Sequence, residues 1–194
     1  MSFATLGLVP ALVRAPTDAG YFMPTPVQSA AIPAVLRGQD VLGLAQTGSG
    51  KTAAFSLPLL QRCAAAPRHR SRRAVHTLVL VPTRELAAQV GETLRLLGQH
   101  LHERPKIAVL FGGVSVNPQM MALRGGADIV VATPGRLLSV SLQSVTSVLS
   151  FCQRQIRVGL DARGFHRERL LTDGSLASAG PSESWSFQLA QPCV

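Results

Sequence analysis

Residues 45–52 read Ala-Gln-Thr-Gly-Ser-Gly-Lys-Thr, and the predicted fold follows from this segment and its surroundings. The apolar run at residues 41–45 leads into it, and helix-forming residues 53–55 follow it, so a glycine-rich turn joins a predicted strand to a predicted helix. Glycines let the backbone turn tightly enough for several N–H groups to face one anion, and the start of a helix adds its positive dipole end. A Gly-Lys-Thr sequence at this junction therefore predicts a phosphate-binding loop.

The last two residues of this loop carry its chemistry. Lys51 is expected to reach the β- and γ-phosphates of a nucleotide, and the Thr52 hydroxyl is expected to bind Mg²⁺. The alternative is a chance glycine-rich turn, which the position between a strand and a helix argues against. Lys51 and Thr52 are the predicted catalytic residues, and Thr52 is the predicted metal ligand.

Three further apolar runs, at residues 77–81, 107–111 and 128–132, are rich in β-branched residues and lack polar alternation. Such runs are typical of strands that are buried on both faces of a parallel sheet. Between the first two, residues 85–97 place apolar side chains at helical spacing. Alternating strands and helices predict a doubly wound α/β domain, in which the sheet is parallel.

The bulk composition agrees with one folded domain. The chain has 194 residues, of which 46% are hydrophobic and 15% charged, and its formal net charge of +9 favours a polyanionic partner. Nucleic acid fits this charge better than a membrane does, because no basic amphipathic segment stands out. The alternative is an arginine-rich composition without any ligand behind it.

Cysteine usage and hydropathy indicate the compartment. Cys63, Cys152 and Cys193 are scattered and include no C-x-x-C pair, so neither a disulfide framework nor a zinc site is indicated. The first residues lack the features of a signal peptide, and no run of eighteen apolar residues occurs. We expect a cytoplasmic protein with no membrane partner.

The loop begins with Ala45 where the general pattern has glycine, and this variant resembles the DEAD-box family of RNA helicases. Residues 20–28, Gly-Tyr-Phe-Met-Pro-Thr-Pro-Val-Gln, look like the adenine-recognition motif of that family, with Phe3 as its upstream aromatic residue. An amide such as that of Gln28 can both accept from and donate to an adenine edge, and an aromatic ring can stack on the base. The alternative for Gln28 is a buried amide satisfied by backbone groups.

Three downstream motifs look like the RNA-contact motifs of the family. They are Pro-Thr-Arg-Glu-Leu-Ala at residues 82–87, a glycine pair at residues 112–113, and Thr-Pro-Gly-Arg at residues 133–136. Each follows a predicted strand, so their loops should share the carboxyl edge of the sheet, where open α/β folds bind ligands. Backbone amides, hydroxyls and arginines there can hold phosphate and sugar without reading bases.

The resemblance implies an ATP-dependent RNA helicase that uses ATP and Mg²⁺ as cofactors and binds RNA without sequence preference. The residues that it places at the nucleotide are Phe3, Thr25, Gln28, Ala45, Gln46, Thr47, Gly48, Ser49, Gly50, Lys51 and Thr52. The residues that it places at the RNA are Pro82, Thr83, Arg84, Gly112, Gly113, Thr133, Pro134, Gly135 and Arg136.

The family pattern breaks after residue 138. The family continues with a strand that ends in Asp-Glu-Ala-Asp and then a Ser-Ala-Thr motif. Here the acidic residues after Arg136 are isolated from one another, and the buried-strand signals stop. We expect an adenine-recognition segment at residues 1–28, a partial RecA-like domain at 29–138, and a poorly ordered tail outside the family at 139–194. The acidic residues of this tail are Asp161, Glu168, Asp173 and Glu183.

A shifted reading frame is one hypothesis for this tail. In the frame that joins the third base of each codon to the first two of the next, residues 153–156 can spell Glu-Ala-Asp and residues 185–189 can spell Val-Phe-Ser-Ala. That frame gives neither the first Asp of the acidic motif nor the final Thr of the second motif. A divergent tail is the alternative.

Three functions compete on the sequence alone. The family implies ATP-dependent RNA unwinding, but the printed polypeptide lacks the acidic motif and a second domain, so we expect it to be inactive as a helicase. The rival is a binding protein that holds nucleotide or RNA without turnover. A third, an unrelated phosphate-loop enzyme such as a small-molecule kinase, is opposed by Gln28 and by residues 82–87.

Overall fold

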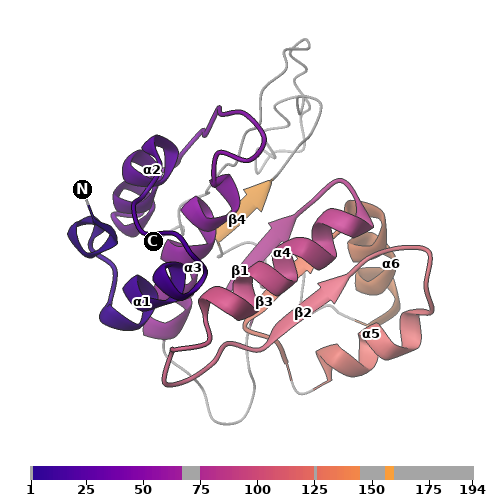
Figure 1. The fold of residues 1–194 in the computed structure, drawn as a ribbon. Coiled ribbons are helices and arrows are strands. Elements are labelled where there is room, and N and C mark those ends of the chain that lie inside the picture. Colours follow the sequence, from indigo (N-terminus) through magenta and orange to yellow (C-terminus); the bar gives the residue numbers. More distant parts are fainter. Residues whose placement is uncertain (1, 67–74, 125, 145–155, 160–194) are drawn as a thin grey trace.

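A computed structural model describes residues 2–66, 75–124, 126–144 and 156–159. The elements alternate along the chain as the sequence predicts, after an N-terminal group of helices (Figure 1). In chain order they are η1 (Phe3–Leu6), α1 (Pro10–Asp18), α2 (Pro26–Leu36), α3 (Lys51–Ala65), β1 (Thr77–Leu80), α4 (Arg84–Leu97), β2 (Ile107–Leu110), α5 (Val116–Leu123), β3 (Ile129–Ala132), α6 (Pro134–Ser144) and β4 (Ile156–Gly159).

The four strands form one parallel sheet in the order β2-β3-β1-β4. The predicted strands 77–81, 107–111 and 128–132 are confirmed to within a residue or two at each end. Leu80 and Leu110 are both register partners of Ala132, so these three strands end at the same level. The loops that follow them therefore emerge side by side at one edge of the sheet.

Helices cover both faces of this sheet, which confirms the predicted doubly wound class. Successive strand residues point to opposite faces. Val79 and Val131 belong to the core cluster that holds the buried residues of α3 and α4. Leu78 and Val130 belong to a second cluster, against which Leu123 of α5 and Leu137 of α6 pack. The larger core lies on the α3 and α4 side.

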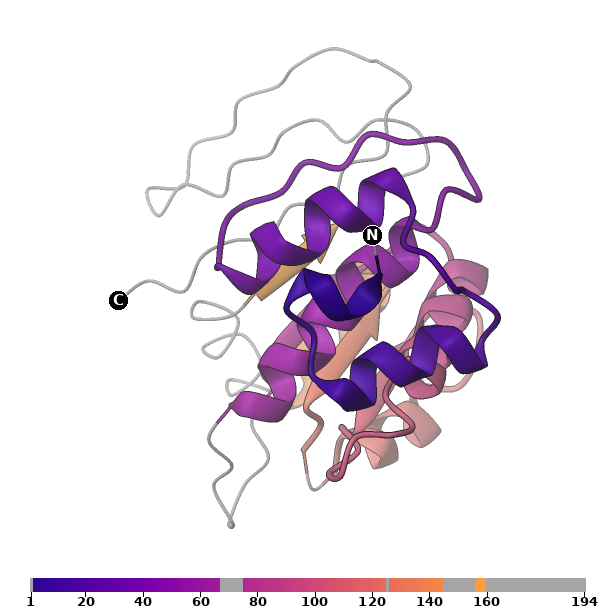
Figure 2. The same cartoon turned by 60° about the vertical axis from the view of Figure 1, so that its left-hand side comes forward.

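The N-terminal helices extend this larger core. Leu12 of α1, Ile32 of α2 and Phe55 of α3 are all fully buried in the same cluster. The Gln61 side chain of α3 donates to the carbonyl of Gly7 (3.0 Å) and accepts from the N–H of Val9 (2.8 Å). Figure 2 shows η1, α1 and α2 gathered beside α3. The segment that contains the adenine-recognition residues thus packs directly on the helix that follows the phosphate loop.

The predicted strand at residues 41–45 is wrong, because the structure gives this segment no regular secondary structure and no place in the sheet. Leu42 is 66% exposed and Leu44 is 58% exposed, where burial on both faces was expected. A strand needs a neighbouring strand for its N–H and C=O groups. Residues 41–45 pair with none of the described strands, although β2 and β4 each have an outer side without a neighbour in this four-stranded sheet.

Past residue 138, where the sequence shows no buried-strand signal, the structure describes the strand β4. β4 pairs in parallel with β1 along its whole length, and Gly159 lies opposite Leu80. Its sequence, Ile-Arg-Val-Gly, gives a weak strand signal because it is short and contains an arginine. Edge strands tolerate charged residues, so tertiary pairing could overcome the weak signal. The acidic residues of the predicted tail lie outside the described residues, and the boundary at 138 stays a prediction.

Candidate nucleotide and RNA sites

The phosphate loop depends on two glycines with left-handed backbone. Gly48 has φ +79° and Gly50, the N-cap of α3, has φ +87°, a region that other residues rarely adopt. A Cβ added to Gly50 would lie only 2.4 Å from Nε2 of Gln28, whereas one added to Gly48 would meet nothing within 4 Å. Glycine is therefore needed at position 50 for two reasons, which are its left-handed backbone and the close approach of the Gln28 side chain.

Lys51 folds back into the loop that precedes it. Its Nζ donates to the carbonyl oxygens of Ala45 and Gln46, and the residue is only 8% exposed. Burial lowers the pKa of the Lys51 ammonium. A carbonyl oxygen carries only a partial negative charge, whereas a phosphate carries a full one. A phosphate would therefore form stronger hydrogen bonds with the Lys51 ammonium than these two carbonyls do.

The other groups at this loop suit phosphate and Mg²⁺. Within the described residues, the buried Ser49 hydroxyl has no hydrogen-bond partner. The first turn of a helix leaves backbone N–H groups without intrahelical acceptors, and here that turn begins at Lys51. The described part of the chain holds no cluster of three His, Cys, Asp or Glu side chains that could bind a metal. An Mg²⁺ ion at this loop would take the Thr52 hydroxyl and phosphate oxygens among its ligands.

The adenine-recognition residues meet the phosphate loop through Gln28. Its Oε1 accepts from the backbone N–H of Thr25 (3.0 Å), and its Nε2 donates to the carbonyl of Gly50 (3.1 Å). The Thr25 hydroxyl accepts in turn from the N–H of Gln28 (3.4 Å), which completes a capping box at the start of α2. Gln28 is 1% exposed, which matches the alternative of an amide satisfied by backbone groups. Its contact with adenine stays a prediction.

Phe3 lies in the core. Its ring is 3% exposed, so no face is open for a base to stack on. The exposed aromatic residues of this region are Tyr21 and Phe22, which are 51% and 75% exposed in the turn between α1 and α2. Both residues lie within the predicted adenine-recognition motif at residues 20–28, and their aromatic side chains were the available sequence signal. Stacking by Phe3 stays a prediction that requires η1 to move.

The first RNA motif sits at the junction of β1 and α4. The Thr83 hydroxyl caps α4 by accepting from the N–H of Leu86 (3.2 Å). Arg84 is exposed and forms an ion pair with Glu85 (2.6 Å), whose hydrogen bond lowers the pKa of the Glu85 carboxyl. A Cβ added to Gly113, which has φ +83°, would lie 3.3 Å from Nη1 of Arg84. The arginine of the first motif thus reaches the glycine pair.

The last RNA motif also contacts the glycine-pair loop. Arg136 donates from Nε to the carbonyl of Phe111 (3.0 Å) and from Nη2 to the carbonyl of Val114 (2.6 Å). Thr133 donates its N–H to the carbonyl of Leu110 (2.9 Å). The structure therefore brings together the three motifs that the sequence places at the carboxyl edge. The same loop is also held by Gln119 of α5, whose side chain bonds to the N–H and the carbonyl of Phe111. Gln119 was not a predicted site residue, because no local sequence pattern marks it.

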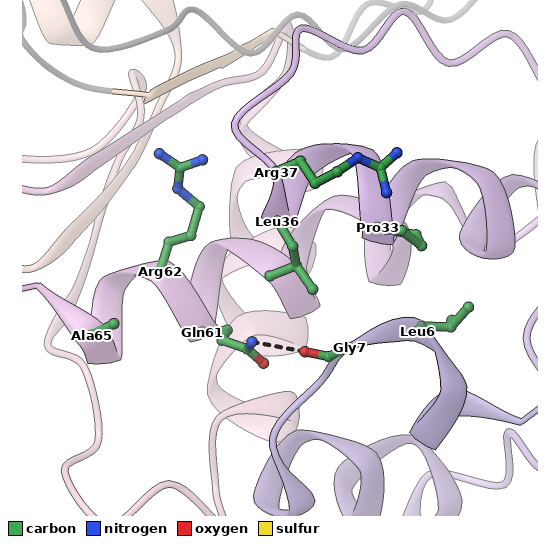
Figure 3. A pocket seen from close by; sticks show the side chains of 8 residues that line it. All are labelled: Leu6, Gly7, Pro33, Leu36, Arg37, Gln61, Arg62 and Ala65. Atoms are coloured by element: carbon green, nitrogen blue, oxygen red, sulfur yellow. Dashed lines mark hydrogen bonds between the residues drawn. The ribbon is translucent and has the colours of Figure 1, made fainter. Parts of the chain in front are cut away.

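A cavity of about 400 Å³ lies elsewhere, between η1, α2 and α3 (Figure 3). The Gln61 to Gly7 hydrogen bond crosses it, and Arg62 donates to the carbonyl of Val35 at the end of α2 (3.1 Å). It is lined by Leu6, Gly7, Pro33, Leu36, Arg37, Gln61, Arg62 and Ala65. None of these belongs to the phosphate loop or to the RNA motifs, so the chemistry of the loops, not this cavity, defines the candidate site.

A doubly wound parallel sheet with a Gly-Lys-Thr loop at the start of a helix defines a P-loop nucleotide-binding domain. A family model described as DEAD/DEAH box helicase matches residues 25–155. This chain belongs to the DEAD/DEAH box helicase family, as its motifs predict.

Curated relatives agree with this assignment. The chain is 50% identical over 137 residues to "ATP-dependent RNA helicase DeaD" of Escherichia coli strain K12, an alignment that covers 71% of this chain and 21% of that protein. It is 49% identical over 137 residues to "ATP-dependent rRNA helicase rrp3" of Emericella nidulans, which covers 71% of this chain and 28% of that protein. The chain thus spans less than a third of the length of these relatives.

Solved structures show the same fold. The RNA helicase Prp28 from Chaetomium thermophilum bound to ADP has a TM-score of 0.65 and 40% identity, over 76% of this chain and 36% of that one. A hypothetical ATP-dependent RNA helicase from Sulfolobus tokodaii has a TM-score of 0.61 and 38% identity, over 73% of this chain and 38% of that one. Among the helices that the structure describes, none is long and apolar enough to span a membrane.

Proposed function

We propose that this chain provides the ATP- and RNA-binding domain of an ATP-dependent RNA helicase. The observation that carries the proposal is that three RNA motifs follow strands that end level with one another, in a domain whose α3 begins at a phosphate loop. The Gln28 bond to Gly50 joins this loop to the adenine-recognition segment. Nucleotide and RNA would therefore bind to loops of one rigid scaffold.

In this proposal Lys51 and Thr52 act on the nucleotide. The Lys51 ammonium leaves the carbonyls of Ala45 and Gln46 to bind phosphate oxygens, and the Thr52 hydroxyl ligates Mg²⁺. When bound, the ion neutralises phosphate charge. Catalysis of phosphoryl transfer rests on such positioning and charge stabilisation.

The RNA would be held by its backbone. Phosphate and sugar can be contacted by the Arg84 side chain, by the hydroxyl groups of Thr83 and Thr133, and by the backbone N–H groups of Gly112 and Gly113. Such contacts position a strand but carry no base information. We therefore expect binding without sequence preference, so that oligo-U and oligo-A of equal length bind with affinities within about threefold of each other. A strong preference for one base would contradict this part of the proposal.

The nucleotide half is tested by comparing the two lysines of the chain. Lys51→Met should weaken binding of Mg-ATP by at least about tenfold, because charge-assisted contacts to phosphate are lost. Lys106→Met is the matched control. Lys106 lies just before the amino end of β2, whereas the RNA motifs follow the carboxyl ends of the strands, and its Nζ donates to the carbonyl of Arg124 (3.0 Å). Titration with a fluorescent ATP analogue measures both variants. Equal affinities for the two variants would refute the assignment of the loop.

A second candidate is binding without turnover, and one observation favours it. After Arg136 the printed sequence holds no two adjacent carboxylates, whereas nucleotide hydrolysis in this class requires carboxylates that hold the metal or orient the water. RNA-stimulated ATP hydrolysis by the chain should then equal that of the Lys51→Met variant. Hydrolysis that depends on Lys51 would eliminate this candidate and would support the first one.

A further inference from the structure

The glycine-pair loop is clamped at its start by a buried amide. Gln119 of α5 is 8% exposed, and its Oε1 accepts from the N–H of Phe111 (3.2 Å) while its Nε2 donates to the carbonyl of the same residue (3.0 Å). One side chain thus occupies both backbone groups of Phe111, as a neighbouring strand would. This arrangement holds the backbone in place as it leaves β2 and enters the loop.

Arg136 fixes the same loop on both sides of the glycines. Its Nε donates to the carbonyl of Phe111 and its Nη2 donates to the carbonyl of Val114. A planar guanidinium can bridge two carbonyls in this way because its donors form a rigid fork. Gly112 and Gly113 lie between these two anchored carbonyls and are exposed.

Arg84 differs from Arg136 in its surroundings. Its side chain is 61% exposed and stands beside Gly113. Its one ion pair within the described residues is with the exposed Glu85, and such a pair is worth little in water. Arg136 is half-buried, and two of its nitrogens already donate to backbone carbonyls. The exposed Arg84 is therefore suited to binding a phosphate, and Arg136 is suited to holding the backbone of the glycine-pair loop.

We infer that Gln119 and Arg136 are positioning residues, which hold the Gly112–Gly113 loop in the shape that receives an RNA phosphate, and that Arg136 does not itself bind phosphate. The inference rests on the proposed function of this loop in RNA binding. In it, Arg84 supplies the positive charge, and the loop supplies backbone N–H groups whose direction Gln119 and Arg136 set.

The salt dependence of RNA binding separates a phosphate contact from a positioning role. For single strands, each phosphate contact adds about 0.7 to the slope of log affinity against log salt. Arg136→Met should lower the affinity of the full chain for oligo-U roughly three- to tenfold, as expected for lost hydrogen bonds, and leave this slope unchanged. Arg84→Met should lower the slope by about 0.7.

Arg136→Lys sharpens this comparison because it keeps the charge and removes the fork. We expect it to bind oligo-U as weakly as Arg136→Met does. If Arg136→Lys binds like the wild type, and Arg136→Met lowers the salt slope as Arg84→Met does, Arg136 is a phosphate contact and the inference is wrong.

Gln119→Met tests the amide clamp, with the exposed Gln89 of α4 as the matched site for the control Gln89→Met. Backbone amide exchange at residues 111–114 should become faster in Gln119→Met alone, while Mg-ATP affinity, which reports the fold, stays at the wild-type value. Should Gln119→Met fail to fold, Gln119→Glu replaces it, because a carboxylate still accepts from Phe111 but no longer donates to it. Unchanged exchange at residues 111–114 would overturn the inference.

The two proposals fail in distinguishable ways. If the wild-type chain binds no RNA, the proposed function fails, and the clamp is then decided by amide exchange alone. Faster exchange at residues 111–114 in Gln119→Met and in Arg136→Met would still support the clamp, and unchanged exchange would still refute it.

Discussion

At the scale of single residues, Gln28 connects two motifs that are separate in the sequence. It belongs to the adenine-recognition segment, yet its amide donates to the carbonyl of Gly50 at the end of the phosphate loop. The family resemblance predicts a role for Gln28 at the base, and the structure adds a contact to the phosphate side.

Gly50 is the residue on which this contact depends most. We expect Gly50→Ala to destabilise the domain more than Gly48→Ala does. Both changes force alanine into the left-handed region, at a cost of about 1–2 kcal/mol, but only the first brings a Cβ to within 2.4 Å of Gln28. Overpacking of this kind adds about 1–3 kcal/mol.

Urea unfolding of the two alanine variants measures this difference. Adding Gln28→Ala to the Gly50→Ala variant should recover part of the loss, because it removes the obstructing amide. Equal destabilisation by Gly48→Ala and Gly50→Ala would show that the Gln28 contact is not formed in solution.

At the scale of elements, α4 was predictable and its packing was not. The apolar spacing predicted a helix over residues 85–97, and the structure has it at Arg84–Leu97 with Val90 and Leu94 fully buried. The spacing could not show how closely the helix approaches β2. Gly91 is buried, and a Cβ added there would lie 2.6 Å from Cγ2 of Val109.

We expect Gly91→Ala to destabilise the domain, although it replaces a glycine inside a helix. Alanine gains about 1 kcal/mol of helix propensity over glycine, but forcing a Cβ against Val109 costs about 1–3 kcal/mol. In a Val109→Ala background the obstruction is gone, and the same change should become stabilising. Thermal unfolding of the four chains of this double-mutant cycle tests the sign of both effects. A stabilising Gly91→Ala in the wild-type background would contradict the close approach.

At the scale of the whole molecule, the sheet is built around β1. It lies between β3 and β4, and β4 comes from a part of the sequence far from β1. Residues 41–45 pair with none of the described strands. The family match extends to residue 155, past residue 138, where the family pattern is predicted to end.

We expect the coding DNA beyond the Arg136 codon to contain, in one shifted reading frame, an acidic motif that includes Glu-Ala-Asp, followed by a second motif that includes Ser-Ala. Hydrolysis in this class needs carboxylates of that kind, and residues 153–156 and 185–189 can encode parts of the two motifs in one shifted frame. Resequencing this DNA through several hundred bases tests the hypothesis. If all three frames lack an acidic motif, the tail is a divergent one and the frame hypothesis is wrong.

By itself, the sequence determined the phosphate loop, the order of the RNA motifs, three of the four strands and the family. These depend on local patterns, because a glycine turn, an apolar run or a tetrapeptide needs only its own neighbours in the chain. Only the tertiary structure decided that Gln28 donates to Gly50, that Gln119 and Arg136 hold Phe111, and that β4 pairs with β1. Each of these contacts satisfies a backbone group of another element, at a sequence separation of eight residues for Gln119 and of 22 or more for the others, and which elements meet is decided when the helices and strands pack.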